Sequence, residues 1–322
     1  MTPGERPVRL AVIGVGHLGR HHARVAASLP GVEVAGVLDH HNGRAEDVAR
    51  EFGLKTLADL AAVASVAEAA VVATPTVSHA EIASELLEKG VDVLVEKPMT
   101  ASLEEADGLV ALARAKGRIL AVGHIERHNP AVEAAMTLAP SPVFVEVDRL
   151  GSFTRRSLDV DVVLDLMIHD LQIVQSLARR PVEEIRAAGL AVLTPLVDIA
   201  NARIAFQGGC VANLTASRVS ARKVRKLRVF APSLYLSVDM QARAVSAFRL
   251  SRGGSEPEIA FEQVAVAPEE PLARELADFA ASVRSRRPPL VDGAAGRAAL
   301  ALAIDVLRAI ELHRLSAGGV PA

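Results

Sequence analysis

The chain has 322 residues, half of them hydrophobic, and a formal net charge of −2 at neutral pH. This length allows two domains, and the near balance of charges excludes the strong positive field that draws a protein to nucleic acid or to an anionic membrane. Cys210 is the only cysteine, so a disulfide within the chain and a cysteine-based zinc site are excluded. No signal peptide is recognisable, and charges interrupt every apolar stretch well short of about 18 residues. We therefore expect a soluble cytoplasmic protein without a membrane span.

Short β-branched runs alternate with alanine-rich helical patterns over the first third of the chain. Ser102 followed by Glu105 is a capping-box start for the last of these helices. Strands that alternate with helices of this length predict an α/β fold with a parallel sheet. The predicted strands are Val8–Ile13, Val32–Leu38, Ala69–Ala73, Val91–Val95 and Ile119–Val122, and the predicted helices are residues 17–28, 42–52, 76–89 and 102–116.

The pattern changes after Pro142. A half-exposed strand at 143–150 and a helix at about 161–178 come first, and short strands separated by glycine-containing turns then fill residues 182–265. This predicts a mostly antiparallel open sheet, with the helices at 161–178 and 270–286 on one face and a last helix at 293–314. We predict a dinucleotide-binding domain at residues 1–124 and an α+β domain for substrate binding and oligomerisation at residues 125–322.

A glycine-rich turn, Gly14-Val-Gly16-His-Leu-Gly19, joins the first predicted strand to the first helix. The first glycine permits the tight turn, the second lets the backbone approach a pyrophosphate, and the third lets the helix pack on the strand. The helix N-terminus directs its free N–H groups at the phosphates. Strand, glycines and helix have the order of a Rossmann dinucleotide site, so we predict that the three glycines, His17 and Leu18 bind the cofactor.

Asp39 ends the second predicted strand, 20 residues after Gly19. A carboxylate at this point accepts hydrogen bonds from the adenosine ribose and repels a 2′-phosphate, which favours NAD over NADP. His40, which we also place at the cofactor, and its neighbours His41 and Arg44 leave NADP possible, because cations here can hold such a phosphate.

Two other candidate sites are set aside. His17, His21 and His22 are close in sequence, but their helix positions are expected to face solvent or phosphates, so no metal site is predicted. Cys210 beside Gly208-Gly209 is interpreted as a small buried strand residue and not as a nucleophile.

The strand at 91–95 ends in Glu96, Lys97 and Pro98. Pro98 stops the strand and restricts Lys97 to an extended conformation, and a lysine at the end of an apolar strand is unusual because burial disfavours its charge. From these residues alone, a solvated ion pair and a functional lysine are both open. Ligands of doubly wound sheets bind outside the carboxyl ends of the strands, which favours the functional lysine.

The chain resembles the Gfo/Idh/MocA oxidoreductase family over essentially its whole length. The resemblance rests on the glycine-rich turn, Thr74-Pro75, His79 and the triplet at 96–98. A Glu-Lys-Pro triplet at the end of a fifth strand is the most specific mark of this family. The resemblance implies that Lys97 reaches the substrate as well as the nicotinamide ribose. The cofactor-contacting residues that it implies are Thr74, Pro75, His79, Glu96 and Lys97.

Asp165 and His169 match the Asp-x-x-x-His signature of the same family. A spacing of four places both side chains on one helix face, aimed at one cleft. An isolated pair of this kind is more simply a surface aspartate and a half-buried histidine, and only the triplet at 96–98 favours the functional interpretation. Two features depart from the family pattern. Gln172 stands where an aspartate is common, with Asp170 directly after the histidine, and Asp159-Val-Asp161-Val-Val replaces a glycine pair.

Residues 123–130, 159–170 and 198–202 resemble members of the family that oxidise the C3 hydroxyl of UDP-N-acetylglucosamine, so that an aminotransferase can install an amine for amide-linked lipid A. A UDP-sugar carries a diphosphate, so cations are expected along its path, although each arginine taken alone is as simply a surface charge. The candidates for binding the substrate are Arg127, Arg155, Arg156 and Arg218.

Oxidation of an alcohol needs a C–H bond held against the nicotinamide and an acceptor for the hydroxyl proton. We predict Lys97 as the principal acid/base, His169 as hydroxyl anchor or relay, and Asp165 as their support, with an exchange of the first two roles left open. The alternatives are a dehydrogenase of another sugar or polyol, of the inositol or glucose type, and a non-catalytic NAD-binding sensor or scaffold.

The sheet at 182–265 has a second face that the helices leave uncovered. We predict that it carries apolar residues such as Leu214, Val229 and Leu236 and forms a homodimer or homotetramer.

Overall fold

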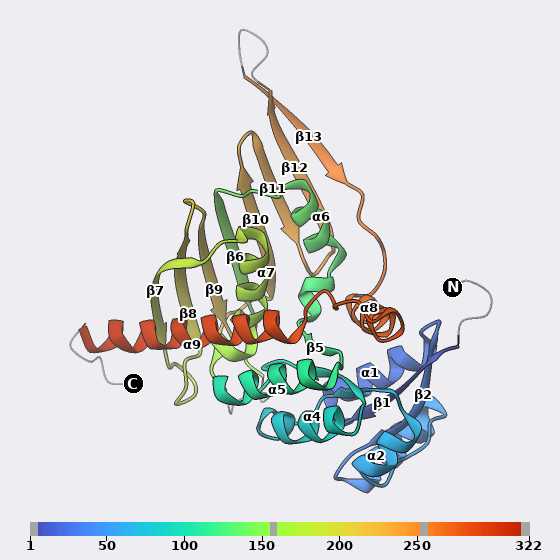
Figure 1. The fold of residues 1–322 in the computed structure, drawn as a ribbon. Coiled ribbons are helices and arrows are strands. Elements are labelled where there is room, and N and C mark those ends of the chain that lie inside the picture. Colours follow the sequence, from blue (N-terminus) through green and yellow to red (C-terminus); the bar gives the residue numbers. More distant parts are fainter. Residues whose placement is uncertain (1–5, 155–159, 252–256, 317–322) are drawn as a thin grey trace. The chain divides into compact units, whose positions relative to one another are not determined.

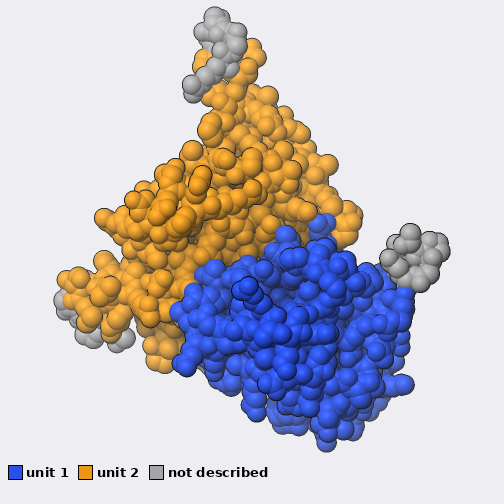
Figure 2. Space-filling model, in the orientation of Figure 1, with its two compact units in different colours: residues 1–125, 270–298 blue, residues 126–269, 299–322 orange. Residues whose placement is uncertain are grey.

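The computed structural model describes residues 6–154, 160–251 and 257–316. The chain forms two compact units, which Figure 2 distinguishes by colour. The first consists of residues 1–125 and 270–298, and the second of residues 126–269 and 299–322. Within the described ranges, no helix is long and apolar enough to cross a membrane.

The first unit contains a five-stranded parallel sheet in the order β2-β1-β3-β4-β5. Figure 1 labels its strands β1, β2 and β5. Strands β3 and β4 are buried along their whole length, as expected for a parallel sheet. The strands are β1 Val8–Ile13, β2 Val32–Leu38, β3 Ala69–Val72, β4 Asp92–Glu96 and β5 Leu120–Gly123, and the helices are α1 His17–Ser28, α2 Asn42–Phe52, α3 Leu60–Val66, α4 His79–Glu88 and α5 Leu103–Lys116, with a 3₁₀ turn η1 Thr76–Ser78 before α4.

These elements confirm the predicted α/β fold and its parallel sheet. Ser102 and Glu105 form the predicted capping box at the start of α5. Helix α3 was not predicted; Asp59 caps it by accepting a hydrogen bond from Ala62 N–H at 2.7 Å. The triplet at 96–98 follows β4, the fourth strand in chain order, and not a fifth strand.

Helix α8, Pro271–Ser285, belongs to the first unit. Its apolar residues recur with helical spacing, and Leu272, Leu276, Phe279 and Val283 lie in one core cluster with Val8 of β1. The prediction that residues 270–286 cover the second sheet is therefore wrong. The amphipathic pattern showed that one face of this helix is buried, but not which sheet buries it.

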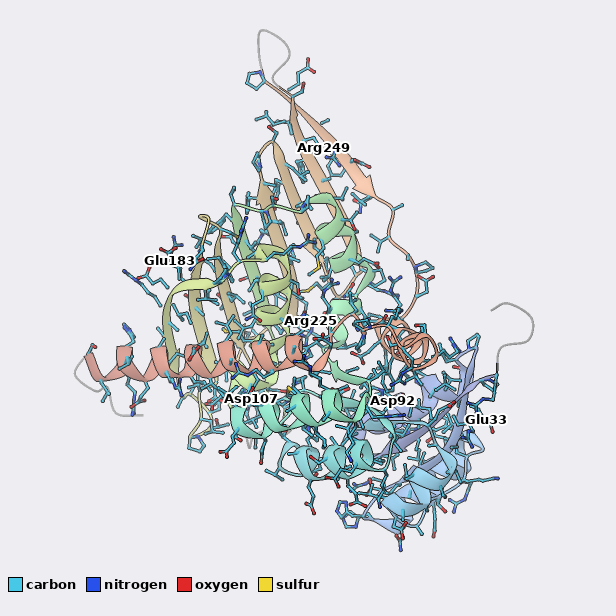
Figure 3. All side chains as sticks on the ribbon, in the orientation of Figure 1. Glu33, Asp92, Asp107, Glu183, Arg225 and Arg249 are labelled. Atoms are coloured by element: carbon cyan, nitrogen blue, oxygen red, sulfur yellow. The ribbon has the colours of Figure 1, made fainter. Side chains whose placement is uncertain are left out.

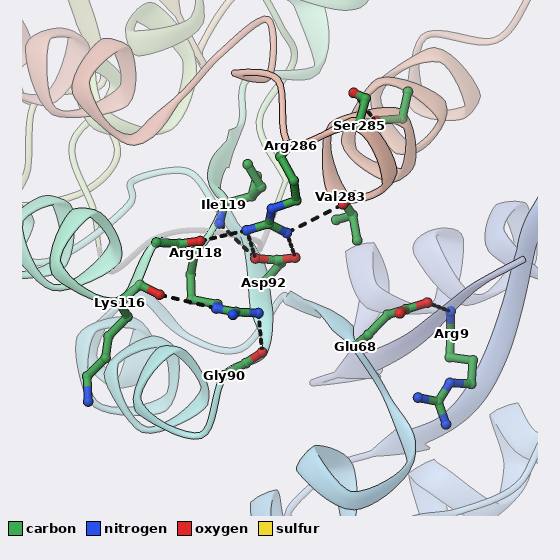
Figure 4. Close-up of polar contacts among 12 residues, drawn as sticks. Arg9, Glu68, Gly90, Asp92, Lys116, Arg118, Ile119, Val283, Ser285 and Arg286 are labelled. Carbon is green, nitrogen blue, oxygen red and sulfur yellow. Dashed lines mark hydrogen bonds and ion pairs between the residues drawn. The ribbon is translucent and has the colours of Figure 1, made fainter. Parts of the chain in front are cut away.

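A buried carboxylate ties the segment after α8 to the first sheet (Figure 4). Asp92 at the start of β4 is 2% exposed. It accepts hydrogen bonds from both terminal nitrogens of Arg286 and, at 2.8 Å, from the N–H of Ile119. Arg286 also donates to the carbonyl of Gly117 at 2.7 Å, so one guanidinium joins the end of α8 to β4 and to the end of α5.

The second unit is built on an eight-stranded sheet in the order β13-β12-β11-β10-β6-β9-β8-β7. Neighbouring strands are antiparallel except β6 and β9, which confirms the predicted mostly antiparallel sheet. Figure 3 labels Glu183 on β7 and Arg249 on β12, near the two edges of the sheet. The strands are β6 Phe144–Leu150, β7 Val182–Leu190, β8 Ile199–Phe206, β9 Val211–Ser217, β10 Val224–Ala231, β11 Leu234–Asp239, β12 Ala244–Ser251 and β13 Glu258–Val264, and the helices are α6 Pro130–Leu138, a π-helical turn η3 Val163–Met167, α7 Ile168–Ala178 and α9 Gly293–Ser316, which begins in the first unit.

The two faces of this sheet differ from the prediction. Leu214, Val229 and Leu236 are at most 1% exposed, so they belong to the buried face and not to an uncovered one. Alternation along the strands places a row of aromatic rings on the opposite face, with neighbouring centroids 4.8–5.7 Å apart. This aromatic row consists of Phe144, Phe230, Tyr235, Phe248 and Phe261, one residue from each of five adjacent strands.

Candidate active site

Each of the three glycines in the turn between β1 and α1 has different surroundings. A Cβ atom on Gly19 would lie 1.7 Å from the carbonyl oxygen of Gly14, so only glycine fits where the helix meets the turn. Gly14 has φ +78°, a conformation that favours glycine, and lies against Ala73 after β3. A Cβ on Gly16 would meet nothing within 4 Å. The middle glycine therefore leaves open the space that a pyrophosphate fills in such turns.

Asp39 connects this turn to the end of β2. Its Oδ2 accepts a hydrogen bond from Val15 N–H and its Oδ1 from His41 N–H, both at 2.9 Å. Burial acts to raise the pKa of Asp39, but these N–H groups and nearby Arg44 outweigh it and lower the pKa below its usual value. The side chain is only 2% exposed, so in this structure the ionised carboxylate holds the turn in place. Its contact with a ribose stays a prediction.

A surface pocket of about 430 Å³ opens beside the turn. Arg20 and Glu51 form an ion pair on its wall, and Nε of the arginine lies 2.8 Å from the carboxylate. His40 stands next to Asp39 with its side chain 72% exposed, and Leu18 is 36% exposed. The pocket is lined by Val15, Gly16, His17, Arg20, Arg44, Asp47, Val48 and Glu51.

His79 links the loops that follow β3 and β4. Its Nδ1 lies 2.9 Å from the carbonyl oxygen of Pro98, and its Nε2 lies 2.8 Å from that of Thr74. Burial lowers the pKa of His79, and its contacts with these carbonyls oppose that shift. Ser78 donates to the Thr74 hydroxyl at 2.9 Å, whereas Pro75 is exposed. The imidazole thus sets the spacing between the two loops that the resemblance assigns to the cofactor.

Glu96 ends β4 and is 5% exposed. Its Oε1 lies 2.7 Å from Nε2 of His22, and its Oε2 accepts from Lys97 N–H at 3.2 Å. A Cβ on Gly123 of β5 would lie 2.7–2.8 Å from this carboxylate, so the glycine makes room for it. Lys97 is half-buried and precedes a cis peptide bond to Pro98. His22 is fully buried, so the expectation that it faces solvent or phosphate is wrong.

The residues of the first unit fit a bound dinucleotide. The turn offers open space above Gly16 and the N-terminus of α1, and the loops at Thr74 and Pro98 lie at the carboxyl ends of neighbouring strands. Such edges are where doubly wound sheets hold their ligands.

In the second unit, Asp165 and His169 lie on successive helical segments. Asp165 is half-buried in the π-helical turn η3, and His169 is 8% exposed in the first turn of α7. Single π-turns of this kind are frequent at functional sites. The predicted regular helix from Asp161 therefore begins with a wider turn that carries the first residue of the signature.

A buried ion network adjoins the signature. Arg149 on β6 is 1% exposed and donates to both oxygens of Asp170 at 2.7 and 2.6 Å, and to Glu126 at 2.8 Å. Burial acts to raise the pKa of Glu126, but the charge and hydrogen bond of Arg149 outweigh it and lower the pKa. The carboxylate next to His169 is thus engaged by an arginine. Gln172 donates to Ser176 Oγ at 3.0 Å within α7.

The predicted substrate arginines lie in different surroundings. Arg127 is half-buried in a short 3₁₀ helix, η2 Ile125–His128. Arg218 is 6% exposed, donates to the carbonyl of Val160 and lies 3.7 Å from Asp198, which gives it a place in the packing of a loop. Arg155 and Arg156 lie outside the described residues.

The sequence suggested no role for the buried residues Arg149 and Glu275, and His22 was expected to face solvent or phosphate. Arg149 stands in an alternating strand where its side chain falls on the buried face, which is a detectable signal for a structural ion pair. His22 and Glu275 gave no such signal, because each is one of several polar residues on its amphipathic helix.

Comparison with known proteins assigns the family and the fold. The oxidoreductase family Gfo/Idh/MocA, described as having an NAD-binding Rossmann fold, matches residues 8–124, and its C-terminal domain matches residues 131–232. UDP-N-acetylglucosamine 3-dehydrogenase from Acidithiobacillus ferrooxidans is 38% identical over 307 residues, which are 94% of this chain and 97% of the relative. The chain belongs to the Gfo/Idh/MocA oxidoreductase family.

Solved structures agree with this membership. A structure of UDP-N-acetylglucosamine 3-dehydrogenase from Acidithiobacillus ferrooxidans has a TM-score of 0.89 and 37% identity, and covers 96% of this chain and 99% of its own. A second similar protein, scyllo-inositol 2-dehydrogenase (NAD(+)) from Bacillus subtilis, is 30% identical over 67% of this chain and 69% of the relative. The family resemblance inferred from the sequence is confirmed, and the protein is an NAD-binding oxidoreductase.

Proposed function

We propose that the protein is an NAD-dependent dehydrogenase that oxidises the C3 hydroxyl of UDP-N-acetylglucosamine to a ketone. The observation that carries this proposal is similarity over nearly the full length to an enzyme named for that reaction, across both units. The ketone would then receive an amine, as in the synthesis of an amide-linked lipid A precursor.

The first unit provides the residues for the cofactor. The glycine turn and the N-terminus of α1 would hold the pyrophosphate, and the loops joined by His79 would border the nicotinamide end. When bound, NAD supplies the acceptor for the hydride of the substrate.

The protein itself must take the hydroxyl proton. We assign this to Lys97, which follows the buried end of β4 and whose backbone N–H is held by Glu96. His169 anchors the hydroxyl or relays the proton, and Asp165 supports them. The signature residues lie on two consecutive helical segments, which supports paired roles.

The diphosphate of the substrate requires cations. Arg127 is the described candidate, and we also assign this role to Arg155 and Arg156. Arg218 is less suited, because it is buried against Val160 and Asp198.

A dehydrogenase of the inositol type is the second candidate, since scyllo-inositol 2-dehydrogenase is also similar to this chain. The two are separated by following NADH formation with NAD and a panel of UDP-N-acetylglucosamine, other UDP-sugars, glucose and inositols. Turnover confined to UDP-N-acetylglucosamine supports the proposal. Turnover with free polyols supports the second candidate, and a protein that binds NAD but oxidises none of them is a sensor or scaffold.

Self-association would use the outer face of the second sheet. The aromatic row is half-exposed there, and Phe261 is 62% exposed. We propose a homodimer or homotetramer through this row, in the cytoplasm, where the single buried Cys210 stays reduced. Light scattering of a Phe248→Glu variant should report a smaller particle than the wild-type protein, and an unchanged mass would exclude this face.

A further inference from the structure

Three ionisable side chains meet inside the first unit, next to the triplet at 96–98. His22 comes from α1, Glu96 from β4 and Glu275 from α8, and they are 0%, 5% and 2% exposed. One nitrogen or oxygen atom of each lies within 4.8 Å of the others. Glu275 has no role in the proposed cofactor site or in the proton transfer assigned to Lys97.

Glu275 is the unusual member of this cluster. Within the described residues, neither of its carboxylate oxygens has a hydrogen-bond partner. Burial, followed by the negative charges of Glu96 and of Asp278 on the same helix, raises the pKa of Glu275 well above its usual value. Asp278 is itself engaged by Arg287 and by Leu290 N–H, and no described cation faces the Glu275 oxygens at ion-pair distance. An ionised carboxylate is strongly disfavoured in such a place.

Glu96 has the opposite surroundings. It faces the ring nitrogen of His22 at 2.7 Å and the N–H of Lys97 at 3.2 Å, and Gly123 leaves room for its carboxylate. Both neighbours can donate, so Glu96 is the acceptor of the cluster and carries its negative charge. A neutral neighbour within 4.8 Å would place no second charge next to this carboxylate.

We propose that Glu275 is protonated at neutral pH, and that its neutral side chain lies against the His22–Glu96 pair and positions the Glu96 carboxylate beside Lys97. The cluster then holds one buried negative charge instead of two. The protonation of Glu275 does not depend on the proposed function, whereas its consequence for cofactor binding rests on the proposed NAD-dependent function.

A divalent metal ion is the competing explanation for the same residues. Ligands of a tetrahedral zinc site with bonds of about 2.0–2.1 Å lie about 3.3 Å apart. The distance of 2.7 Å between His22 Nε2 and Glu96 Oε1 is shorter than that and is typical of a hydrogen bond. The geometry therefore favours a proton over a metal ion between these two side chains.

Infrared spectroscopy of the full-length protein tests the proton directly. At pH 7 the wild-type spectrum should contain the C=O stretch of a protonated carboxylic acid, and Glu275→Gln should remove it. The matched control is Glu88→Gln, an exposed glutamate of α4, which should leave the band unchanged. Absence of the band from the wild-type protein overturns the proposal even if the variant does not fold. So does its persistence in Glu275→Gln.

Stability against pH gives the second readout. The folded pKa of Glu275 is raised, so its contribution is greatest below the unfolded value of about 4.3 and is lost as pH rises toward the folded value. In that window the unfolding constant of the wild-type protein should rise about tenfold per pH unit relative to Glu275→Gln. A ratio independent of pH would contradict the inference.

The positioning role predicts a pattern of NAD affinities. Glu275→Gln keeps the shape and the neutral state and should leave Kd within about threefold, whereas Glu275→Ala should weaken NAD at least about tenfold. Equal loss in both variants argues for an ionised residue and against the proposal. If the purified wild-type protein contains one metal ion per chain and Glu275→Gln contains none, the cluster binds a metal ion and the proposal is wrong. Failure to oxidise any sugar would affect the proposed function alone, because none of these readouts requires turnover.

Discussion

Replacing Arg149 by methionine should strongly destabilise the second unit. The arginine is 1% exposed and makes two hydrogen bonds to Asp170 and one to Glu126. Methionine fills most of its volume but leaves two carboxylates buried without their cation. Removing one partner of a buried ion pair costs about 3–5 kcal/mol. At about 2–4 °C per kcal/mol for a domain of this size, the melting temperature should fall by about 6–20 °C.

The control is the same substitution at Arg228, whose side chain is 32% exposed and pairs with Asp148 on the outer face of the sheet. It should cost less than about 1 kcal/mol. The assay is thermal unfolding of both variants followed by circular dichroism. If Arg149→Met melts within about 2 °C of Arg228→Met, the ion network does not stabilise the unit and the reasoning is refuted.

The network also predicts a pH dependence. Arg149 holds the pKa of Glu126 below its ordinary value, so the stability gained from this pair is complete above the unfolded pKa of about 4.3 and is lost as pH falls through the lower folded value. The difference in melting temperature between wild type and Arg149→Met should therefore shrink on acidification. A constant difference would mean that Glu126 is not part of the stabilising pair.

Three further variants test separate parts of the account. Gly16→Ala should keep the melting temperature, since its Cβ meets no protein atom. The same Cβ enters the pyrophosphate space, so the affinity for NAD measured by calorimetry should fall at least about tenfold. An unchanged affinity would mean that the cofactor does not bind at this turn. Gly123→Ala should displace the Glu96 carboxylate and weaken NAD by a similar factor, and an unaltered Kd would show that Glu96 does not contact the cofactor. Asp198→Ala removes the acceptor of three backbone N–H groups and should cost about 3 kcal/mol or more in thermal unfolding, whereas a neutral result would mean that water replaces the carboxylate.

Local patterns in the sequence predicted much of the first unit. The glycine turn, the capping box at Ser102 and the five strands follow from short-range rules, because steric limits and capping act within a few residues. The triplet at 96–98 was recognisable for the same reason. Its surroundings were not, since His22 and Glu275 reach Glu96 from helices that are remote in sequence.

Long-range packing accounts for the predictions that failed. The period of two in β9–β11 distinguishes two faces of a sheet, but it does not say which face the helices cover, so Leu214 was assigned to the wrong one. Helix α8 likewise has one apolar stripe that fits either sheet, and residues such as Phe279 pack in the first unit. The departures at Asp170 and Gln172 were visible in the sequence, but the partner of Asp170, Arg149, was not.

The most direct test of the proposed function compares NADH formation by the wild-type protein and by Lys97→Met with UDP-N-acetylglucosamine and NAD. The wild-type protein should form NADH, and the variant should still bind NAD but turn over at least about 100-fold more slowly, as expected for loss of a general base. Wild-type protein that binds NAD yet forms no NADH from this sugar, or a variant that retains full turnover, would contradict the account.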